Sequence, residues 1–187
     1  MLSKADDYPI HQSLEPIAYA GQSRNFYDRY FFNGYDIEGD VFFALGMGIY
    51  PHVDVIDAGF SLIRNGVQHD LLCSRALGME RMDTKVGNIK VEVVEPLQSL
   101  RLLIDAPQHG IEADLLFTGR APAQEEPRFT RHLGSQLFMD YTRLTQNGQW
   151  EGWIKHQGER INVAPVRWLG TRDRSWGIRP IGERDAQ

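Results

Sequence analysis

The side chains best suited to chemistry gather near the C-terminal end of the sequence, in the stretch LGTRDRSWGIRP at residues 169–180. In an extended segment, Arg172 and Arg174 point to one side while Asp173 and Ser175 point to the other. If Asp173 faces inward it needs partners, because an unpaired buried carboxylate is costly, and a further arginine and an indole N–H lie close by in the chain. Two interpretations stay open: a structural corner held by Asp173, or part of the lining of a ligand pocket.

A second concentration of useful side chains is RNFYDRYFFNGY, residues 24–35. Its aromatic residues can simply pack the core as the first strand of a barrel. Alternatively, Tyr27 and Tyr30 point their hydroxyls into an apolar pocket, where a tyrosine orients a ligand or donates a proton. His52 and Asp54 follow at a spacing that places both on one face of a strand and permits an acid–base pair.

No metal or cofactor signature accompanies these residues. The histidines are scattered, without the HxH, HxxxH or HExxH spacing of metal sites built on one element. No glycine-rich nucleotide loop opens a helix, and no GxSxG elbow is present. The sequence therefore predicts no bound metal and no cofactor. The single Cys73 cannot form an internal disulfide, and its neighbours are those of a strand with a small buried thiol.

The composition is that of an ordinary folded protein, with 42% hydrophobic and 24% charged residues and a formal net charge of −5. A negative balance argues against a nucleic-acid or anionic-membrane surface, since both call for basic patches. No stretch approaches the roughly 18 apolar residues of a membrane span, and the N-terminus has no apolar core of a signal sequence. We therefore expect a soluble, cytoplasmic protein that binds no nucleic acid and has no membrane span.

Short alternating runs dominate the remaining sequence. Residues 89–93, 100–104 and 111–117 each alternate apolar and polar side chains with the period of a half-buried strand, and turn residues separate them. Strands that recur about every 8–12 residues are typical of a sandwich or barrel. The sequence predicts one all-β domain over residues 1–187, either an antiparallel barrel or a strongly curled sandwich.

Turn signals and irregular segments complete this prediction. Asn-Gly pairs at 65–66 and 147–148 each predict a two-residue hairpin, and a Gln-Gly pair at 157–158 predicts a further turn. Residues 1–23 are expected to form an extended N-terminal arm. Residues 119–134 are expected to form one long loop across an end of the barrel, with a short helical turn or the mobility of a lid.

Residues 24–35 and 169–180 also resemble segments of a known family. RNFYDRYFFNGY and GTRDRSWGIRP resemble segments of a family of uncharacterised bacterial proteins related to the carotenoid 1,2-hydratase group, which includes lipocalin-like Diels-Alderases. In that group a D-x-x-W-G signature closes a strand, and Asp173, Trp176 and Gly177 match it here. Members usually carry two lipocalin-like domains in tandem and are about twice as long. The resemblance implies an N-terminal lipocalin-like domain, or a lone-domain version, and a terpenoid- or polyene-like ligand.

The resulting prediction is a domain that binds a small apolar molecule of terpenoid, polyene or steroid type in a β-barrel pocket. If it is an enzyme, we expect a cofactor-independent hydratase, or an isomerase or cyclase, with Asp173 as acid and Tyr27, Tyr30 or His52 as a second polar group. Arginines close to Asp173 would oppose this role by lowering its pKa. The expected ligand-binding residues are Tyr141, Trp153, Trp168, Arg172 and Trp176.

Two alternatives stay open beside the enzyme. One is a lipocalin-like binding module without chemistry of its own. The other is an architectural role, in which the domain pairs with a second lipocalin-like domain or forms a homodimer that covers an exposed apolar surface.

Overall fold

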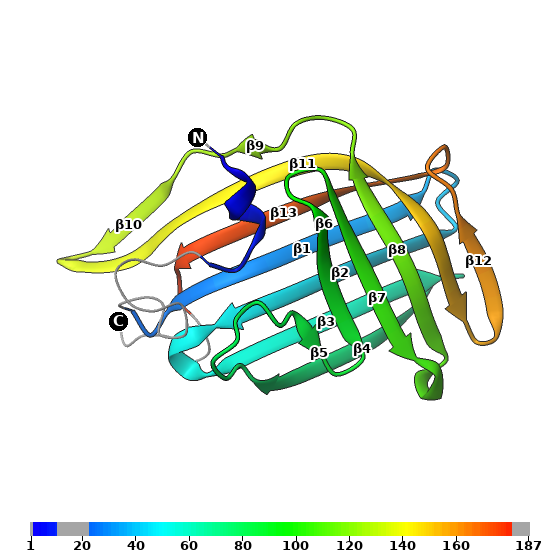
Figure 1. Cartoon of the computed structure of the whole chain (residues 1–187), viewed down its shortest axis with the longest axis horizontal. Coiled ribbons are helices and arrows are strands. Elements are labelled where there is room, and N and C mark those ends of the chain that lie inside the picture. The colour runs from blue at the N-terminus through cyan, green and yellow to red at the C-terminus, as the bar shows by residue number, and fades with distance from the viewer. Residues whose placement is uncertain (1, 11–22, 181–187) are drawn as a thin grey trace.

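The structure, a computed structural model, describes residues 2–10 and 23–180 (Figure 1). Short 3-10 helices in this part of the chain are η1 (Lys4–Asp7), η3 (Pro51–Val53) and η4 (Pro107–His109). The first strands are β1 (Phe26–Asp36), β2 (Val41–Tyr50), β3 (Val55–Arg64), β4 (Val67–Ala76), β5 (Lys85–Val86), β6 (Ile89–Glu95) and β7 (Ser99–Ala106). They are followed by β8 (Ile111–Gly119), β9 (Gln124–Glu125), β10 (Phe129–Leu133), β11 (Gln136–His156), β12 (Glu159–Val163) and β13 (Trp168–Ile178).

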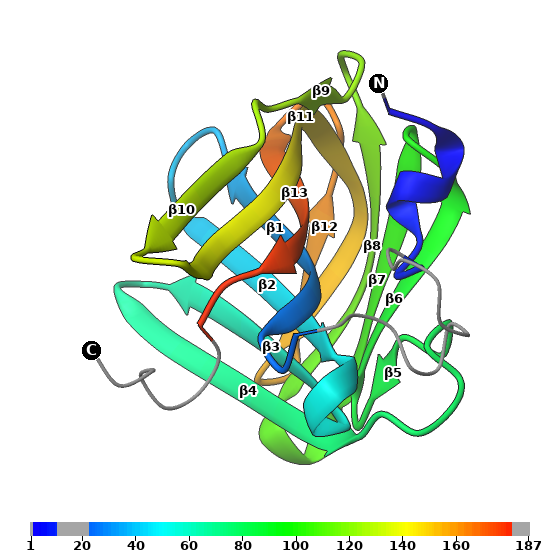
Figure 2. The same cartoon turned by 90° about the vertical axis from the view of Figure 1, so that its left-hand side faces the viewer.

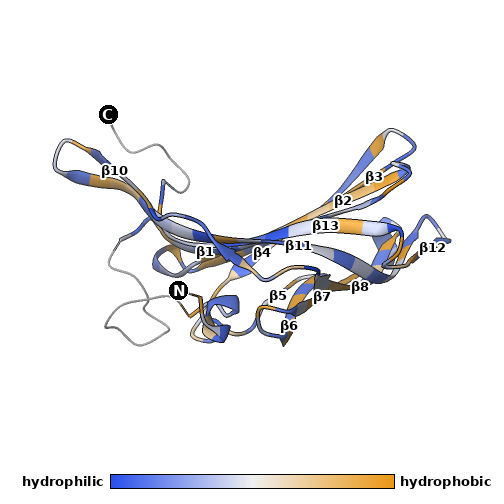
Figure 3. Ribbon diagram, turned by 90° about the horizontal axis from the view of Figure 1, so that it is seen from above, coloured by the Kyte–Doolittle hydropathy of each residue, from blue (hydrophilic) through white to orange (hydrophobic). Residues whose placement is uncertain are grey.

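The strands form one antiparallel sheet in the order β4-β3-β2-β1-β13-β11-β8-β7-β6-β5, with β9, β10 and β12 paired to β11. The sheet curls over, so that β5 to β8 lie as a second layer across β1 to β4, as the face-on and edge-on views show (Figure 1, Figure 3). Within the described chain the edge strands β4 and β5 are not paired with each other. Arg75 of β4 instead donates hydrogen bonds to the carbonyls of Lys85 and Asp83, each at 2.8 Å. The all-β prediction is confirmed, in its curled-sandwich form.

The predicted meander corresponds to β6, β7 and β8, and two of the three predicted turns are present. Asn65 and Gly66 have φ angles of 53° and 75°, and Gln157 and Gly158 have φ angles of 50° and 87°, as tight hairpin turns require. The hairpin predicted at residues 147–148 is wrong, because β11 runs through both residues without turning.

Gly148 has a different role from the predicted one. It pairs with Gly170 of β13 and Gly119 of β8 in the middle of the sheet. A Cβ atom at this position would overlap the Phe117 ring and lie 2.7 Å from the Thr118 carbonyl oxygen. The glycine therefore permits close packing of a core ring against the strand, which is a common reason for glycine inside strands.

The two irregular segments are more structured than expected where they are described. Residues 4–7 of the predicted arm form η1, whereas residues 11–22 lie outside the described residues. The predicted loop 119–134 contains β9 and β10 instead of a helical turn. Strand β10 forms a hairpin with the start of β11 that extends beyond the ends of the neighbouring strands (Figure 1, Figure 2).

Aromatic rings fill the centre of the space between the layers. Phe43 lies 5.0 Å from Trp150, 5.9 Å from Phe60 and 6.3 Å from Trp168, measured between ring centroids. Phe117 approaches Trp150 at 5.2 Å in an edge-to-face arrangement. All five side chains are buried. This packed core fixes the two layers against each other.

The prediction that His52 and Asp54 share one strand face is wrong. Pro51 opens the 3-10 turn η3, and Asp54 follows with a left-handed φ of 52°, so the alternation of a strand does not apply. The Asp54 carboxylate accepts a hydrogen bond from the Gly78 amide at 2.8 Å. Among the described helices, none has the length and apolarity needed to cross a membrane.

Candidate functional site

Strand β13 presents two chemically different faces, as the alternation in its sequence predicts. Arg172 and Arg174 point into the space between the layers and are buried. Asp173 and Ser175 point to the opposite side, which we call the back face: the face of β4-β3-β2-β1-β13-β11 that is turned away from β5 to β8. The same strand therefore contributes to two separate groups of polar residues.

The inner group is a buried charge network made of Asp7, Asp28, Arg81, Arg172 and Arg174, all at most 1% exposed. Arg172 forms an ion pair with Asp7 at 2.5 Å, and Arg174 forms one with Asp28. Arg81 lies 3.6 Å from the same Asp28 carboxylate. Because each aspartate is matched by an arginine, this network has the features of a structural anchor for the N-terminal segment.

Tyr30 belongs to the same interior. Its hydroxyl donates a hydrogen bond to the Asp7 carbonyl oxygen at 2.6 Å, and the Arg174 guanidinium lies over its ring at 4.0 Å. Burial raises the pKa of Tyr30 to about 12. Two predicted site residues, Tyr30 and Arg172, are therefore already engaged in holding the chain together.

The outer group lies on the back face at the end of the sheet where β1 begins. We call it the Asp173 site and define it as Tyr27, Arg29, Tyr141, Asp173 and Ser175. Strand pairing places Arg29 beside Ser175, and Tyr27 and Tyr141 on the two sides of Gly177. Three predicted site residues, Asp173, Tyr27 and Tyr141, are thus brought together here.

The Asp173 site contains polar atoms whose hydrogen-bonding capacity is unused. Within residues 2–10 and 23–180, no hydrogen-bond partner is found for the Tyr27 hydroxyl, Arg29 Nε, Asp173 Oδ1 or the Ser175 hydroxyl, although all four atoms are buried. Tyr27 and Ser175 are only 1% and 2% exposed. Their hydroxyls lie close enough to influence each other, but not in hydrogen-bond geometry. Buried unsatisfied polar atoms are rare, and a bound ligand is one explanation for four of them on one face. Within the described residues, Arg174 of the inner network also has two such nitrogen atoms.

The electrostatics of this site disfavour the charged form of the Asp173 carboxyl group. Burial raises the pKa of Asp173, and this effect outweighs the opposing influence of Arg29 and Arg143. Arg143 is itself ion-paired with Glu126 at 2.5 Å, and the Glu126 charge also raises the pKa of Asp173. Arg29 and Arg143 therefore oppose an acid role by lowering the pKa of Asp173, but the ion pair with Glu126 balances the charge of Arg143. Burial likewise raises the pKa of Tyr27.

An apolar surface adjoins the Asp173 site on the back face. Strand register places Phe31, Gly46, Gly59 and Leu72 in one row that starts at Asp173 and crosses β1, β2, β3 and β4. Leu72 is 79% exposed, and nothing lies within 4 Å of where a Gly46 Cβ atom would be. A second row on the same face contributes the exposed side chains of Tyr35, Phe42 and Ile63. Figure 3 shows that the β10–β11 hairpin at one end, and β2 and β3 at the other, bend away from the second layer on either side of this face.

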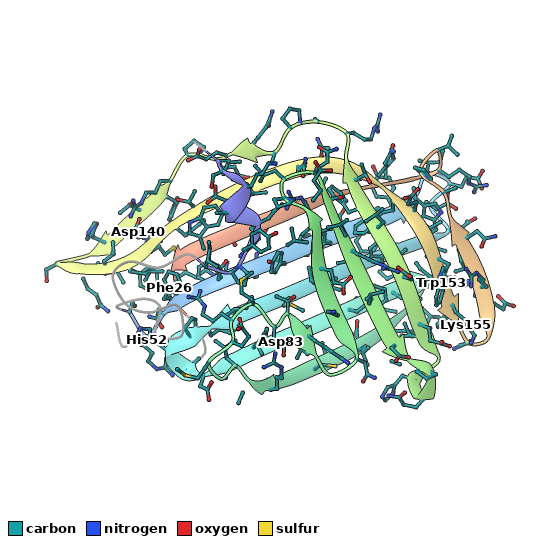
Figure 4. All side chains as sticks on the ribbon, in the orientation of Figure 1. Phe26, His52, Asp83, Asp140, Trp153 and Lys155 are labelled. Carbon is teal, nitrogen blue, oxygen red and sulfur yellow. The ribbon has the colours of Figure 1, made fainter. Side chains whose placement is uncertain are left out.

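The remaining predicted residues are spread over the molecule. Trp168 is a core residue, and Trp176 lies next to Asp28 in the register of β13 and β1. Trp153 lines a separate surface pocket of about 580 Å³, where the Arg160 guanidinium covers its ring at 4.5 Å. His52 is exposed at the opposite end of the sheet from Trp153 (Figure 4).

Arg29, Arg143 and Glu126 were missed by sequence reasoning. Arg29 could have been found, because it stands two residues after Tyr27 and so shares its strand face. Glu126 could not, since it reaches Arg143 only through the pairing of β9 with β11, and the sequence carries no signal for that pairing.

One acidic group in the described chain has the spacing of a metal site. Carboxylate oxygens of Asp36, Glu38 and Asp40 lie within 4.8 Å of one another. Arg167 forms ion pairs with Asp36 at 3.0 Å and with Glu38 at 2.6 Å. The arginine supplies the counter-charge there, so the group is accounted for as an ion-pair cluster.

Comparisons with known proteins agree on the fold. The chain is similar to kievitone hydratase from Nectria haematococca, with 17% identity and a TM-score of 0.61 over 80% of this chain and 47% of that one. It is also similar to CghA in a structure with Sch210972, with 12% identity and a TM-score of 0.51 over 91% of this chain and 52% of that one. The chain thus spans about half the length of these two proteins. No curated protein matches the sequence significantly. A family model does match, over residues 2–187, and the chain belongs to DUF8625, a family of unknown function.

Proposed function

We propose that this domain binds a small, largely apolar molecule on its back face and transfers a proton to it from Asp173, as a cofactor-independent hydratase, isomerase or cyclase. The observation that carries the proposal is a set of buried polar atoms on one face, of Tyr27, Arg29, Asp173 and Ser175, that find no hydrogen-bond partner among the described residues. The structural similarity to kievitone hydratase supports the fold on which such a site would be built.

The chemistry follows from the state of the Asp173 carboxyl group. A protonated carboxyl in an apolar setting can donate its proton to an alkene or enol carbon, because burial has already disfavoured its charged form. In a hydration, water then adds to the resulting cation and its proton returns to the Asp173 carboxylate. In an isomerisation, a proton leaves the substrate from another carbon instead.

The neighbouring groups fit the polar end of such a substrate. The Tyr27 and Ser175 hydroxyls can each donate to a substrate oxygen, and the Arg29 guanidinium can stabilise negative charge that develops on it. We therefore expect a substrate with an oxygen substituent, such as a phenol, enol or carbonyl, close to the reacting carbon.

The apolar part of the substrate would lie across β1 and β2. Adjacent strands are about 4.8 Å apart, so Gly46, two strands from Asp173, lies roughly 10 Å away along the sheet. A molecule of isoprenoid or polycyclic size can span that distance. Aromatic rings fill the centre of the interior, whereas the back face carries exposed apolar side chains that a ligand could cover.

The test is a comparison of Asp173→Asn with Asp70→Asn, a carboxylate on the same face that the Ser61 hydroxyl already engages at 2.6 Å. Kievitone and farnesol serve as probes, with binding measured by equilibrium dialysis and hydration by mass spectrometry in ¹⁸O-labelled water. We expect Asp173→Asn to keep binding and lose product formation, and Asp70→Asn to keep both. Equal product formation by the two variants would refute the acid role.

A non-catalytic pairing domain is the second candidate. The exposed side chains of Tyr35, Phe42, Ile63 and Leu72 on the back face, together with the half-length match, favour a second copy or a second domain over this surface. Light scattering after size exclusion tests this role. A dimer that Leu72→Lys dissociates would support it, and a monomer at high concentration would exclude self-pairing.

A further inference from the structure

Two histidines far apart in the sequence meet at the end of the sheet opposite the Asp173 site. His69 lies near the start of β4, and His156 is the last residue of β11. Their ring centroids are 4.4 Å apart with an interplanar angle of 60°. Figure 4 labels Lys155, the neighbour of His156, at the end of the molecule away from His52.

His156 is buried there with an unused nitrogen atom. Its side chain is 4% exposed, and within the described chain Nδ1 has no hydrogen-bond partner. Burial, with the nearby His69 and Arg64, lowers the pKa of His156. A neutral imidazole with a free nitrogen lone pair is the form in which histidine binds a metal ion.

The space next to the two rings is open enough for a hydrated ion. A surface pocket of about 330 Å³ is lined by both histidines together with Arg64, Gln157 and Glu159. Glu159 forms an ion pair with Arg64 at 2.6 Å, and its side chain is 70% exposed. The Arg64–Glu159 pair is neutral overall, which limits repulsion of a cation.

We propose that His69 and His156 bind a divalent transition-metal ion of the Zn²⁺ type, with the Glu159 carboxylate and water as further ligands. Imidazole nitrogen suits Zn²⁺, Ni²⁺ and Cu²⁺, and a carboxylate or water readily completes such a site. The ion would connect β4, an edge strand of the curled sheet, to the β11–β12 hairpin. This proposal departs from the expectation of no metal, which rested on the absence of histidine pairs spaced within single strands.

The experiment uses the full-length protein after treatment with a chelator. Zn²⁺ alone, and then Co²⁺ alone, is titrated by calorimetry, and the melting temperature is measured with and without each ion. We expect one saturable site, a melting temperature that rises with Zn²⁺, and visible Co²⁺ absorption bands of a nitrogen-ligated ion. His69→Ala, at the half-buried position, should weaken Zn²⁺ binding by about 10-fold or more and abolish the Co²⁺ bands.

Two further variants keep the result interpretable. His132→Ala removes an exposed histidine from β10 and should leave binding unchanged. Glu159→Gln removes the carboxylate without touching a buried residue and should weaken binding less than His69→Ala. Absence of saturable binding in the wild-type protein would overturn the proposal, as would equal binding by His69→Ala and His132→Ala. Neither result bears on the Asp173 site.

Discussion

Replacing Arg172 by methionine should destabilise the protein severely, because it leaves a buried aspartate without its cation. The Arg172 guanidinium contacts the Asp7 carboxylate through Nη1 at 2.5 Å and Nη2 at 3.3 Å, and both side chains are at most 1% exposed. After the change, the carboxylate still accepts the hydrogen bond from the Leu97 amide, its one remaining donor among the described residues. Methionine keeps the apolar length of the arginine side chain, so loss of packing contributes little.

The expected magnitude combines two losses. Breaking a buried ion pair by removing one partner costs about 3–5 kcal/mol. The Gln146 side-chain oxygen also loses the donor that now lies 2.7 Å away, which adds about 1 kcal/mol. A total of about 4–6 kcal/mol is a large part of the 5–15 kcal/mol typical of a folded domain. At roughly 2–4 °C per kcal/mol for a chain of this size, the melting temperature should fall by at least about 8 °C.

Urea denaturation followed by tryptophan fluorescence measures the change, with the double variant Asp7→Leu, Arg172→Met as the control. Because the double variant buries no unpaired charge, it should recover at least about 2 kcal/mol relative to the single variant. A single variant that loses less than about 1 kcal/mol would show that water reaches this pair, and the reasoning from burial would then fail.

Three further changes test other features. Gly148→Ala should lower the free energy of unfolding by about 2 kcal/mol or more in urea denaturation, since the new methyl group overlaps the Phe117 ring. Gly46→Ala is the control: its methyl group meets nothing within 4 Å, so the change should be neutral or slightly stabilising. Asp173→Asn should be more stable than wild type at pH 7. Burial raises the pKa of Asp173 in the folded state, so the wild-type protein loses stability as the pH rises from the unfolded pKa of 3.8 through the folded pKa, whereas the variant does not. Melting curves from pH 3 to 8 check this, and a stability difference that did not shrink toward low pH would count against it. Tyr30→Phe should cost about 1–2 kcal/mol by leaving a buried carbonyl without its donor, and a spectroscopic titration should lose the Tyr30 ionisation near pH 12.

Most of the fold could be predicted because local patterns and the architecture agree. Alternation in residues 89–93, 100–104 and 111–117 directly reports strands with one buried face, and the turn at Asn65 needs only local conformation. The error at residues 147–148 has the opposite origin. An Asn-Gly pair permits a turn but does not require one. Here the packing of the Phe117 ring against Gly148 favours an extended strand instead.

The candidate site was predictable in part for the same reason. Alternation correctly separated Arg172 from Asp173, but it could not say which of the two faces the core. That outcome depends on Asp7, which lies far away in the sequence and brings the negative charge that lets the arginine enter the interior. The metal-site proposal has the same character, because His69 and His156 belong to strands that meet only when the sheet curls.

The two faces of β13 separate the two interpretations of its sequence, as a structural corner and as pocket lining. Its arginines form the corner: they hold the N-terminal segment and β1 against the sheet from inside. Its aspartate lies on the other face with a raised pKa and an oxygen atom that has no hydrogen-bond partner among the described residues, a condition that destabilises a domain. Functional residues are where a protein tolerates local cost. If Asp173 were only structural, replacing it with asparagine would lower the stability at neutral pH; an increase in stability there would mark it as a residue kept for its chemistry.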